Sequence, residues 1–240
     1  MQHRVRLGSS SELVIVGTDR SHGDFAVGSE GISARRQELV NCGPWTWLQL
    51  EHGARVIRVD SPGQHAGAIA DAAVTRQRFA PLAITAADCV PVVLGVQARN
   101  KRTGFDDAAI GVAHAGWRGL LAGVVEATAN GIHALFGDEW EVEKRFAFCG
   151  PSIGPEDYAF ADRDAAPLVA RYGDSVMAET RFGGSALDVF EGVRAALQSS
   201  GFPTPSRPPS TVGDSFYSHR IRADPERMVT VAFLDATMAL

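Results

Sequence analysis

The chain has 240 residues, of which 45% are hydrophobic and 21% charged, and its net charge is −5 at pH 7. This composition suffices for a substantial core, and the acidic balance argues against nucleic-acid binding, which normally needs a basic face. The sequence contains neither a signal-peptide segment nor an apolar run of about eighteen residues that would span a membrane. Three cysteines are too few for a disulfide framework. We therefore expect a cytoplasmic protein that binds neither nucleic acid nor membranes.

Short β-rich runs and helical segments alternate along the chain. Eight runs of strand length, most of them bounded by Gly, Pro or Asp, cover residues 13–16, 46–50, 56–59, 82–85, 90–96, 109–113, 146–148 and 228–234. Helical periodicity with a nearby glycine stop marks residues 119–136, 163–172 and 187–197. Several strands come in pairs, so the pattern predicts an α/β fold with a mixed β-sheet core flanked by helices. We expect residues 1–240 to form a single domain.

Three side chains that can bind metal occur at strand ends. His114 lies among small residues in "GVAHAGWRGLL", Cys89 follows Asp88 in "ITAADCVPVVL", and His52 precedes Gly53 on the turn of an apparent hairpin. Each residue alone is explained by an ordinary structural role, although a carboxylate beside a buried thiol must itself be accommodated. Together, two histidines and a cysteine could form a catalytic zinc site with an open fourth position. No compact motif links them, so the residues leave both interpretations open.

The turn that follows His114 could bind an anion. Gly116 and Gly119 flank Arg118 at the start of a helix, where free backbone N–H groups and a guanidinium favour phosphate. The same residues are explained equally well by a tight turn with a solvated surface charge. Neither a Walker loop nor a GxGxxG fingerprint is present.

A second motif suggests a different chemistry. The segment "GPSIG" at residues 150–154 matches the GxSxG pattern of serine hydrolases, and Asp188 and His219 follow Ser152 in the expected order. Pro155 and two acidic residues follow where the helix of such an elbow should begin. A Ser152 hydrolase is therefore disfavoured.

Four segments carry a resemblance to a known family. In order, "TAADCVPVVL", "GVAHAGWRGLLAGVVEAT", "CGPSIGPEDY" and "FYSHR" resemble the family first labelled multicopper polyphenol oxidoreductases, or laccase-domain proteins. That family is now described as zinc-dependent purine nucleoside phosphorylases with adenosine deaminase side activity. The resemblance runs from about Trp45 to the C-terminus. It implies a single α/β domain with a mixed β core, related to the fold of cytotoxic necrotizing factor-like cysteine hydrolases.

The resemblance implies that one zinc ion is bound by His52, Cys89 and His114. Cys89 and His114 would also be catalytic, together with Asp88, which would orient a ligand or accept a proton. Copper is not expected, because multicopper oxidases hold their cluster with many histidines in HxH pairs. This chain has seven histidines and no such pair. A single Cys/His₂ site suits zinc.

The implied reaction is the phosphorolysis of adenosine, inosine or guanosine. Arg118 would bind phosphate, and Arg36 or its neighbour Arg35 would match a family arginine on an N-terminal helix. Trp117 or Phe216 would stack on the purine, although each is equally explained as ordinary core. The expected partners are a purine nucleoside and phosphate, and the expected assembly is a monomer or small homo-oligomer.

The sequence also departs from the family pattern. Leu50 and Glu51 stand before His52, where the family has Gln-Val, and Glu156 and Asp157 stand where it has Cys-Cys. Two alternatives to a phosphorylase therefore remain. One is a Cys/His hydrolase or deamidase of the same fold, and the other is a non-catalytic zinc-binding regulatory protein.

Overall fold

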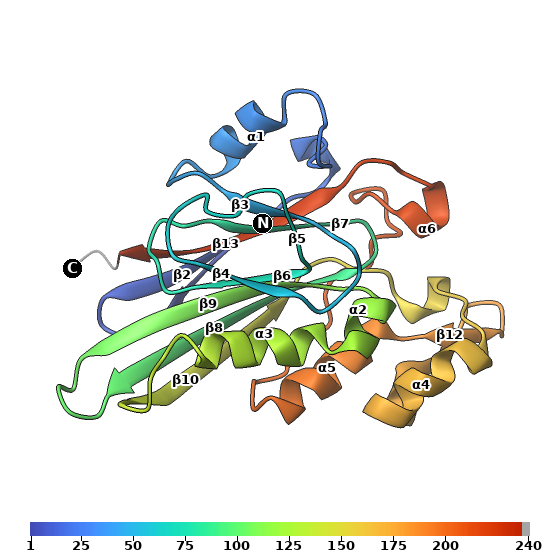
Figure 1. Cartoon of the computed structure of the whole chain (residues 1–240). Coiled ribbons are helices and arrows are strands. Elements are labelled where there is room, and N and C mark those ends of the chain that lie inside the picture. Colours follow the sequence, from blue (N-terminus) through green and yellow to red (C-terminus); the bar gives the residue numbers. More distant parts are fainter. Residues whose placement is uncertain (237–240) are drawn as a thin grey trace.

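Two β-sheets packed face to face form the centre of the protein. The computed structural model describes residues 1–236, and its layers are visible in Figure 1. The first sheet has the strand order β1-β2-β13-β7-β3-β5, formed by Gln2–Arg6, Ser11–Gly17, Met228–Ala236, Leu82–Ala86, Thr46–Gln49 and Ala68–Ile69. The second sheet has the order β10-β8-β9-β6-β4, formed by Trp140–Cys149, Val90–Asn100, Asp106–Ala115, Ala72–Thr75 and Val56–Val59. A separate hairpin pairs β11 (Met177–Glu179) with β12 (Ser185–Leu187).

Both large sheets are mixed. In the six-stranded sheet β3 runs parallel to β5 and β7, and in the five-stranded sheet β4 runs parallel to β6. The remaining pairs in these sheets are antiparallel. The expectation of an α/β fold with a mixed β core is confirmed.

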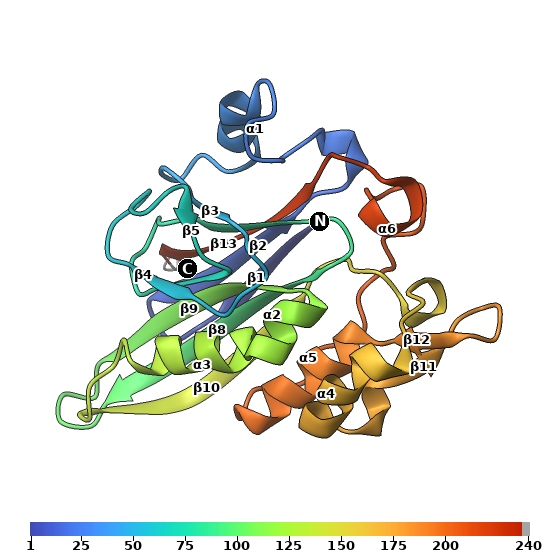
Figure 2. The same ribbon diagram turned by 45° about the vertical axis from the view of Figure 1, so that its right-hand side comes forward.

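Helices cover the outer faces of the two sheets. In Figures 1 and 2, α1 (Ile32–Leu39) lies beside the six-stranded sheet and α6 (His219–Arg222) lies beyond its end. The outer face of the five-stranded sheet carries α2 (Trp117–Ala122), α3 (Val124–His133) and α5 (Val189–Ser199), and α4 (Asp162–Tyr172) packs against α2 and α5. None of the helices in residues 1–236 combines the length and the apolar character that crossing a lipid bilayer demands.

Strand alternation distributes the apolar side chains over separate layers. On β2, Leu13 and Ile15 pack between the two sheets, whereas Val14 packs on the opposite face with Phe25 and Trp45. The five-stranded sheet buries its outer face against α3 and α5 in the same way. Central strands that are covered on both faces carry nearly continuous apolar runs. This explains why "VPVVLGV" on β8 shows no polar alternation.

Two predictions about local structure are wrong. The helix expected over residues 119–136 is two helices, α2 and α3, which meet at Gly123 in a left-handed conformation (φ 87°). Glycine adopts that conformation without the steric cost that other residues incur, so it ends one helix there and begins the next. The hairpin expected around His52 does not form either, because β3 belongs to the six-stranded sheet and β4 to the five-stranded sheet.

Candidate metal centre

Two connections that pass from one sheet to the other bring His52 and Cys89 together. His52 lies between β3 and β4, and Cys89 lies between β7 and β8, so each follows a strand of the first sheet and precedes a strand of the second. His114 is on β9, opposite Pro91 of β8. One ligand atom from each of the three residues lies within 4.8 Å of those of the other two. The three residues expected to bind zinc are therefore adjacent.

The backbone at both connections is held in a conformation that side-chain-bearing residues rarely adopt. His52 has φ 60° and Asp88, directly before Cys89, has φ 93°. Such conformations cost free energy and persist where surrounding contacts fix them, often at functional sites. The Asp88 carbonyl accepts a hydrogen bond of 2.9 Å from the backbone N–H of Ile153.

A carboxylate that the sequence interpretation missed contacts two of the three residues. Asp71, immediately before β6, is completely buried, and its Oδ1 atom lies 3.0 Å from Nδ1 of His114. The same carboxylate accepts hydrogen bonds from the backbone N–H groups of Glu51, His52 and Gly53. The available signal was an acidic residue in the otherwise apolar segment "AIADAAV", because a buried charge needs partners.

Asp88 has a different position from the one expected of a ligand-orienting group. Its Oδ1 atom accepts a hydrogen bond of 2.6 Å from Oγ1 of Thr211, and its Oδ2 atom accepts one of 2.6 Å from the backbone N–H of Arg220. The carboxylate that contacts His114 is that of Asp71. Asp88 therefore anchors the C-terminal segment and α6 beside the centre, and it also lines the cavity into which the centre opens.

The groups around Cys89 and His114 favour a thiolate on the cysteine next to an imidazolium on the histidine. Burial opposes ionisation of Cys89, but His114 and His52 lower the pKa of the thiol below its ordinary value. Burial likewise opposes protonation of His114, but Cys89 and Asp71 raise the pKa of the imidazole. A thiolate is the form in which cysteine binds metal or attacks an electrophile.

The centre opens into a cavity of about 560 Å³. The side chains of His52, Cys89 and His114 line it, and so do four further residues that carry or can acquire positive charge, namely Arg118, His219, Arg220 and Arg227. Apolar lining comes from residues that include Val27, Leu48 and Leu50. The cavity therefore combines a potential metal site with groups suited to an anion and with apolar surface.

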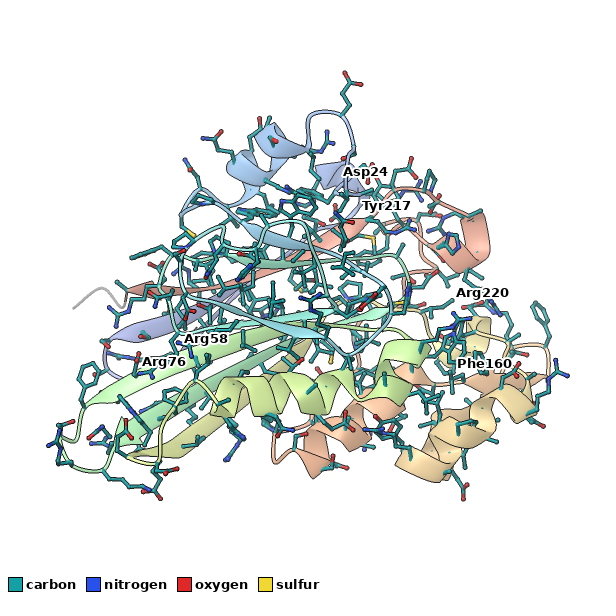
Figure 3. All side chains as sticks on the ribbon, in the orientation of Figure 1. Asp24, Arg58, Arg76, Phe160, Tyr217 and Arg220 are labelled. Atoms are coloured by element: carbon teal, nitrogen blue, oxygen red, sulfur yellow. The ribbon has the colours of Figure 1, made fainter. Side chains whose placement is uncertain are left out.

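Of the three arginines that line the cavity, Arg118 is the one whose guanidinium is least engaged by protein groups. Its guanidinium lies 4.2 Å from the centre of the Trp117 ring, and Trp117 in turn meets Phe160 edge to face at 5.4 Å. No carboxylate in residues 1–236 lies within ion-pair distance of Arg118. By contrast, Arg220 donates to the backbone carbonyl of Ala159. Figure 3 shows Arg220 and Phe160 on the same side of the molecule, between α6 and α4.

Of the other expected substrate contacts, Trp117 lines this cavity, whereas Arg36, Arg35 and Phe216 do not. Arg36 lies over the Trp47 ring at 4.8 Å and lines a separate cavity. Its neighbour Arg35 donates to the backbone carbonyl of Asp24 and to other groups of the same N-terminal segment. Phe216 packs in an apolar cluster with Tyr217 and Met228.

The Ser152 hydrolase motif is not assembled. Ser152 is buried and its backbone pairs with the 209–211 segment. The Asp188 carboxylate accepts hydrogen bonds from the guanidinium of Arg207 and the backbone N–H of Glu191. In the part of the chain that the structure describes, no hydrogen bond joins Asp188 to His219. His219 lines the cavity beside Cys89 instead.

One of the departures from the family pattern lines the cavity, and another directly precedes the lining residue Tyr158 in the chain. Leu50 contributes apolar surface to the lining. Asp157, in the short helix η2 (Pro155–Asp157), forms an ion pair with Arg181 on the β11–β12 hairpin. These residues therefore bear on the shape and fixing of the cavity and leave the three candidate ligands in place.

Similarity to known proteins shows the family of this chain. Residues 24–235 match the family described as multi-copper polyphenol oxidoreductase laccase. The chain belongs to this family. The resemblance identified from the sequence motifs is therefore confirmed.

The relatives bear names that refer to one enzyme activity. A protein of Xylella fastidiosa named "Purine nucleoside phosphorylase" is 33% identical over 205 residues, covering 78% of this chain and 71% of that protein. "Purine nucleoside phosphorylase SCO2081" of Streptomyces coelicolor is 34% identical, covering 79% and 74%. "Purine nucleoside phosphorylase YfiH" of Escherichia coli is 29% identical, covering 78% and 73%.

Solved structures share the fold. A hypothetical protein YfiH of Bacillus licheniformis superposes with a TM-score of 0.70 at 19% identity, covering 96% of this chain and 98% of that one. YlmD of Geobacillus stearothermophilus gives a TM-score of 0.66 at 22% identity, covering 95% and 92%. At these identities the likeness establishes the fold alone.

Proposed function

We propose that the protein is a zinc-dependent purine nucleoside phosphorylase that acts on adenosine, inosine or guanosine, with deamination of adenosine as a second reaction of the same site. The observation that carries the proposal is the grouping of His52, Cys89 and His114 at a cavity that also contains Arg118, which has no carboxylate partner within residues 1–236. The names of the relatives support the reaction class.

The donor set fits zinc. One thiolate and two imidazoles are ligands of the type that zinc takes in catalytic sites, where a fourth position stays open. Nδ1 of His114 is already engaged by Asp71, so Nε2 is the ring nitrogen left for an ion. When bound, zinc would supply Lewis acidity at the open position.

The cavity offers groups for each part of the reaction. Phosphorolysis breaks the bond between ribose C1′ and the purine nitrogen, forms a bond from C1′ to a phosphate oxygen, and leaves the purine with a proton. Arg118 would bind the phosphate through charge-assisted hydrogen bonds. His219 lines the same cavity and would donate the proton to the leaving purine. Burial raises the pKa of Tyr158 to about 12, so its phenol stays a hydrogen-bond donor towards the substrate.

Product analysis by mass spectrometry tests this function. Zinc-loaded protein is incubated with each nucleoside, with and without phosphate, beside a His114→Ala variant of verified fold. We expect free base and ribose 1-phosphate only when phosphate is present, and loss of both products in the variant. Absence of product from all three nucleosides would reject the phosphorylase and leave a non-catalytic zinc-binding protein as the better description.

A second candidate function is a Cys89 hydrolase or deamidase. The observation that favours it is the sequence of contacts from Asp71 to His114 and from His114 to Cys89, because an oriented base beside a nucleophile is the arrangement of a catalytic triad. In that case zinc would inhibit. Removing the metal should then raise hydrolysis of an amide or ester substrate, whereas it should abolish phosphorolysis under the first proposal.

We also propose a cytoplasmic location and a monomer or small homo-oligomer. The support for the location is that the three cysteines are all free, as is usual in a reducing compartment. Fractionation and light scattering test the two statements separately.

A further inference from the structure

We infer that Asp71 is the positioning residue of the metal centre, and that its single carboxylate orients two of the three ligands. The inference rests on the proposed zinc site. It concerns a residue that does not itself bind the ion, and it follows from the hydrogen bonds that converge on one buried side chain.

The first contact fixes the ring of His114. Because an ionised carboxylate can only accept, the Nδ1 atom of His114, 3.0 Å from Asp71 Oδ1, must carry the proton. When the ring gives up its second proton to bind an ion, Nε2 is therefore the nitrogen that becomes available, on the side of Cys89. Strand pairing supports this geometry, since the backbone N–H of His114 also donates to the Asp71 carbonyl at 2.8 Å.

The second set of contacts fixes the loop that carries His52. Asp71 Oδ1 accepts a hydrogen bond of 2.9 Å from the backbone N–H of His52, and Oδ2 accepts one of 2.7 Å from that of Gly53. The backbone N–H of Glu51 is 3.3 Å from the same Oδ2 atom. These bonds hold His52 in its left-handed conformation (φ 60°), which would otherwise be unfavourable for a residue with a side chain.

Only a carboxylate can satisfy all four donors. Two donors converge on each oxygen of Asp71, and the side chain is completely buried. An asparagine would place an NH₂ group against one of the two donor pairs, so it would either turn His114 into the other tautomer or release the His52 loop. Each outcome misplaces a ligand, although neither removes one.

The experiment compares zinc affinity in wild type, Asp71→Asn and a control, Asp188→Asn, by competition with a chromophoric chelator. Asp188 is also a buried carboxylate with hydrogen-bond partners, but it caps α5 away from the centre. We expect affinity about 10- to 100-fold weaker in Asp71→Asn, the usual cost of losing a group that orients a metal ligand, and unchanged affinity in the control. Equal affinity in wild type and Asp71→Asn would overturn the inference.

A spectroscopic measurement on the wild-type protein keeps the test decisive if Asp71→Asn does not fold. Nitrogen-15 NMR of the histidines should show His114 protonated at Nδ1 and metal-bound through Nε2. Metal binding through Nδ1 would overturn the inference, because that atom could not then donate to Asp71. A wild-type protein that binds no zinc at all would instead reject the metal centre in the proposed function, so the two failures are distinguishable.

Discussion

A β-carbon on residue 116 would lie only 2.8 Å from the sulfur of Cys89. This added β-carbon would also lie 3.1 Å from Cδ2 of His52, so Gly116 is in close contact with two of the three candidate ligands. Its backbone angles (φ −81°, ψ 169°) are ones that any residue adopts. Glycine is therefore required here for space and not for conformation.

Replacement of Gly116 by alanine should weaken zinc binding while the fold is retained. Overpacking of this kind costs about 1–3 kcal/mol, and that strain would fall on the positions of Cys89 and His52. Zinc affinity should drop by about 5- to 150-fold, with an unchanged circular dichroism spectrum. Gly213→Ala is the matched control, because nothing lies within 4 Å of its added β-carbon. An equal loss in both variants would show that the effect is not steric crowding at the centre.

Removal of the Arg118 guanidinium should weaken phosphate binding more than nucleoside binding. Arg118 lines the cavity without a carboxylate partner among residues 1–236, so phosphate would be its main counter-charge. A hydrogen bond to a charged group contributes about 1.5–3 kcal/mol, and Arg118→Ala should therefore raise KM for phosphate by about 10- to 100-fold. Steady-state kinetics with phosphate and nucleoside varied in turn measure the two effects. The control is Arg163→Ala, whose side chain is 88% exposed on α4; a selective effect on the nucleoside would contradict the assignment.

The three cysteines should differ sharply in reactivity when the metal is absent. Burial, with the nearby Asp235, raises the pKa of Cys42 to about 11, and burial raises that of Cys149 to about 12. Both stay protonated and unreactive at pH 7.5 because the thiolate is the nucleophile. Cys89 should be alkylated first by iodoacetamide, as peptide mapping would reveal, and zinc should protect it. Faster labelling of Cys42, or labelling of Cys89 that zinc leaves unchanged, would count against the proposed ligand.

Asp224 should make stability depend on pH in the acid range. Burial opposes its ionisation, but the backbone N–H of Ser218 and the guanidinium groups of Arg222 and Arg20 hold its pKa below the ordinary value. Ionised Asp224 therefore contributes to the free energy of unfolding above its ordinary pKa of about 4. This contribution is lost as the pH falls through the lower pKa of the folded state.

Thermal or urea unfolding of Asp224→Asn at several pH values tests this contribution. The variant should be about 1–3 kcal/mol less stable than wild type at pH 7, and the difference should shrink below about pH 4. The exposed Asp138→Asn provides the comparison and should change stability little at any pH. A deficit of Asp224→Asn that is constant down to pH 2 would rule out ionisation as its source.

The long central strands were predictable because their residues are almost all apolar. The β8 and β13 segments combine β-branched residues with burial on both faces, and the pattern of residues 90–96 and 228–234 predicts them directly. Five strands of residues 1–236 escaped prediction, namely β1, β5, β6, β11 and β12. β1 is largely exposed and polar, and β6, "AAVT", is too short and rich in alanine for its sequence to mark a strand. The helix boundary at Gly123 also needed the structure, because glycine within a helical pattern does not always end the helix.

The candidate metal centre was partly predictable from the types of its residues. The types of His52, Cys89 and His114 indicate their chemistry, so local sequence suffices to propose them. Their convergence depends on which sheet each strand joins, and the apparent hairpin at His52 pointed to the wrong pairing. Asp71 was missed because its partners are mostly backbone N–H groups from a distant loop, which leave no mark in the sequence. Arg36 showed the converse difficulty, since its residue type suited phosphate but the fold places it over Trp47 in another cavity.

The position of the ligands at the passages between the sheets has a thermodynamic consequence. An ion held by His52, Cys89 and His114 would join the β3–β4 and β7–β8 connections to β9 of the five-stranded sheet. It would therefore act as a cross-link, which no disulfide supplies here. Unfolding that separates the sheets must then release the ion, which makes the melting temperature rise with free zinc. At a zinc concentration one hundred times the dissociation constant, the gain would be about 2.7 kcal/mol. In a zinc-poor cell the same protein would lose both its reactive centre and part of its resistance to unfolding, so metal supply would govern its abundance as well as its activity.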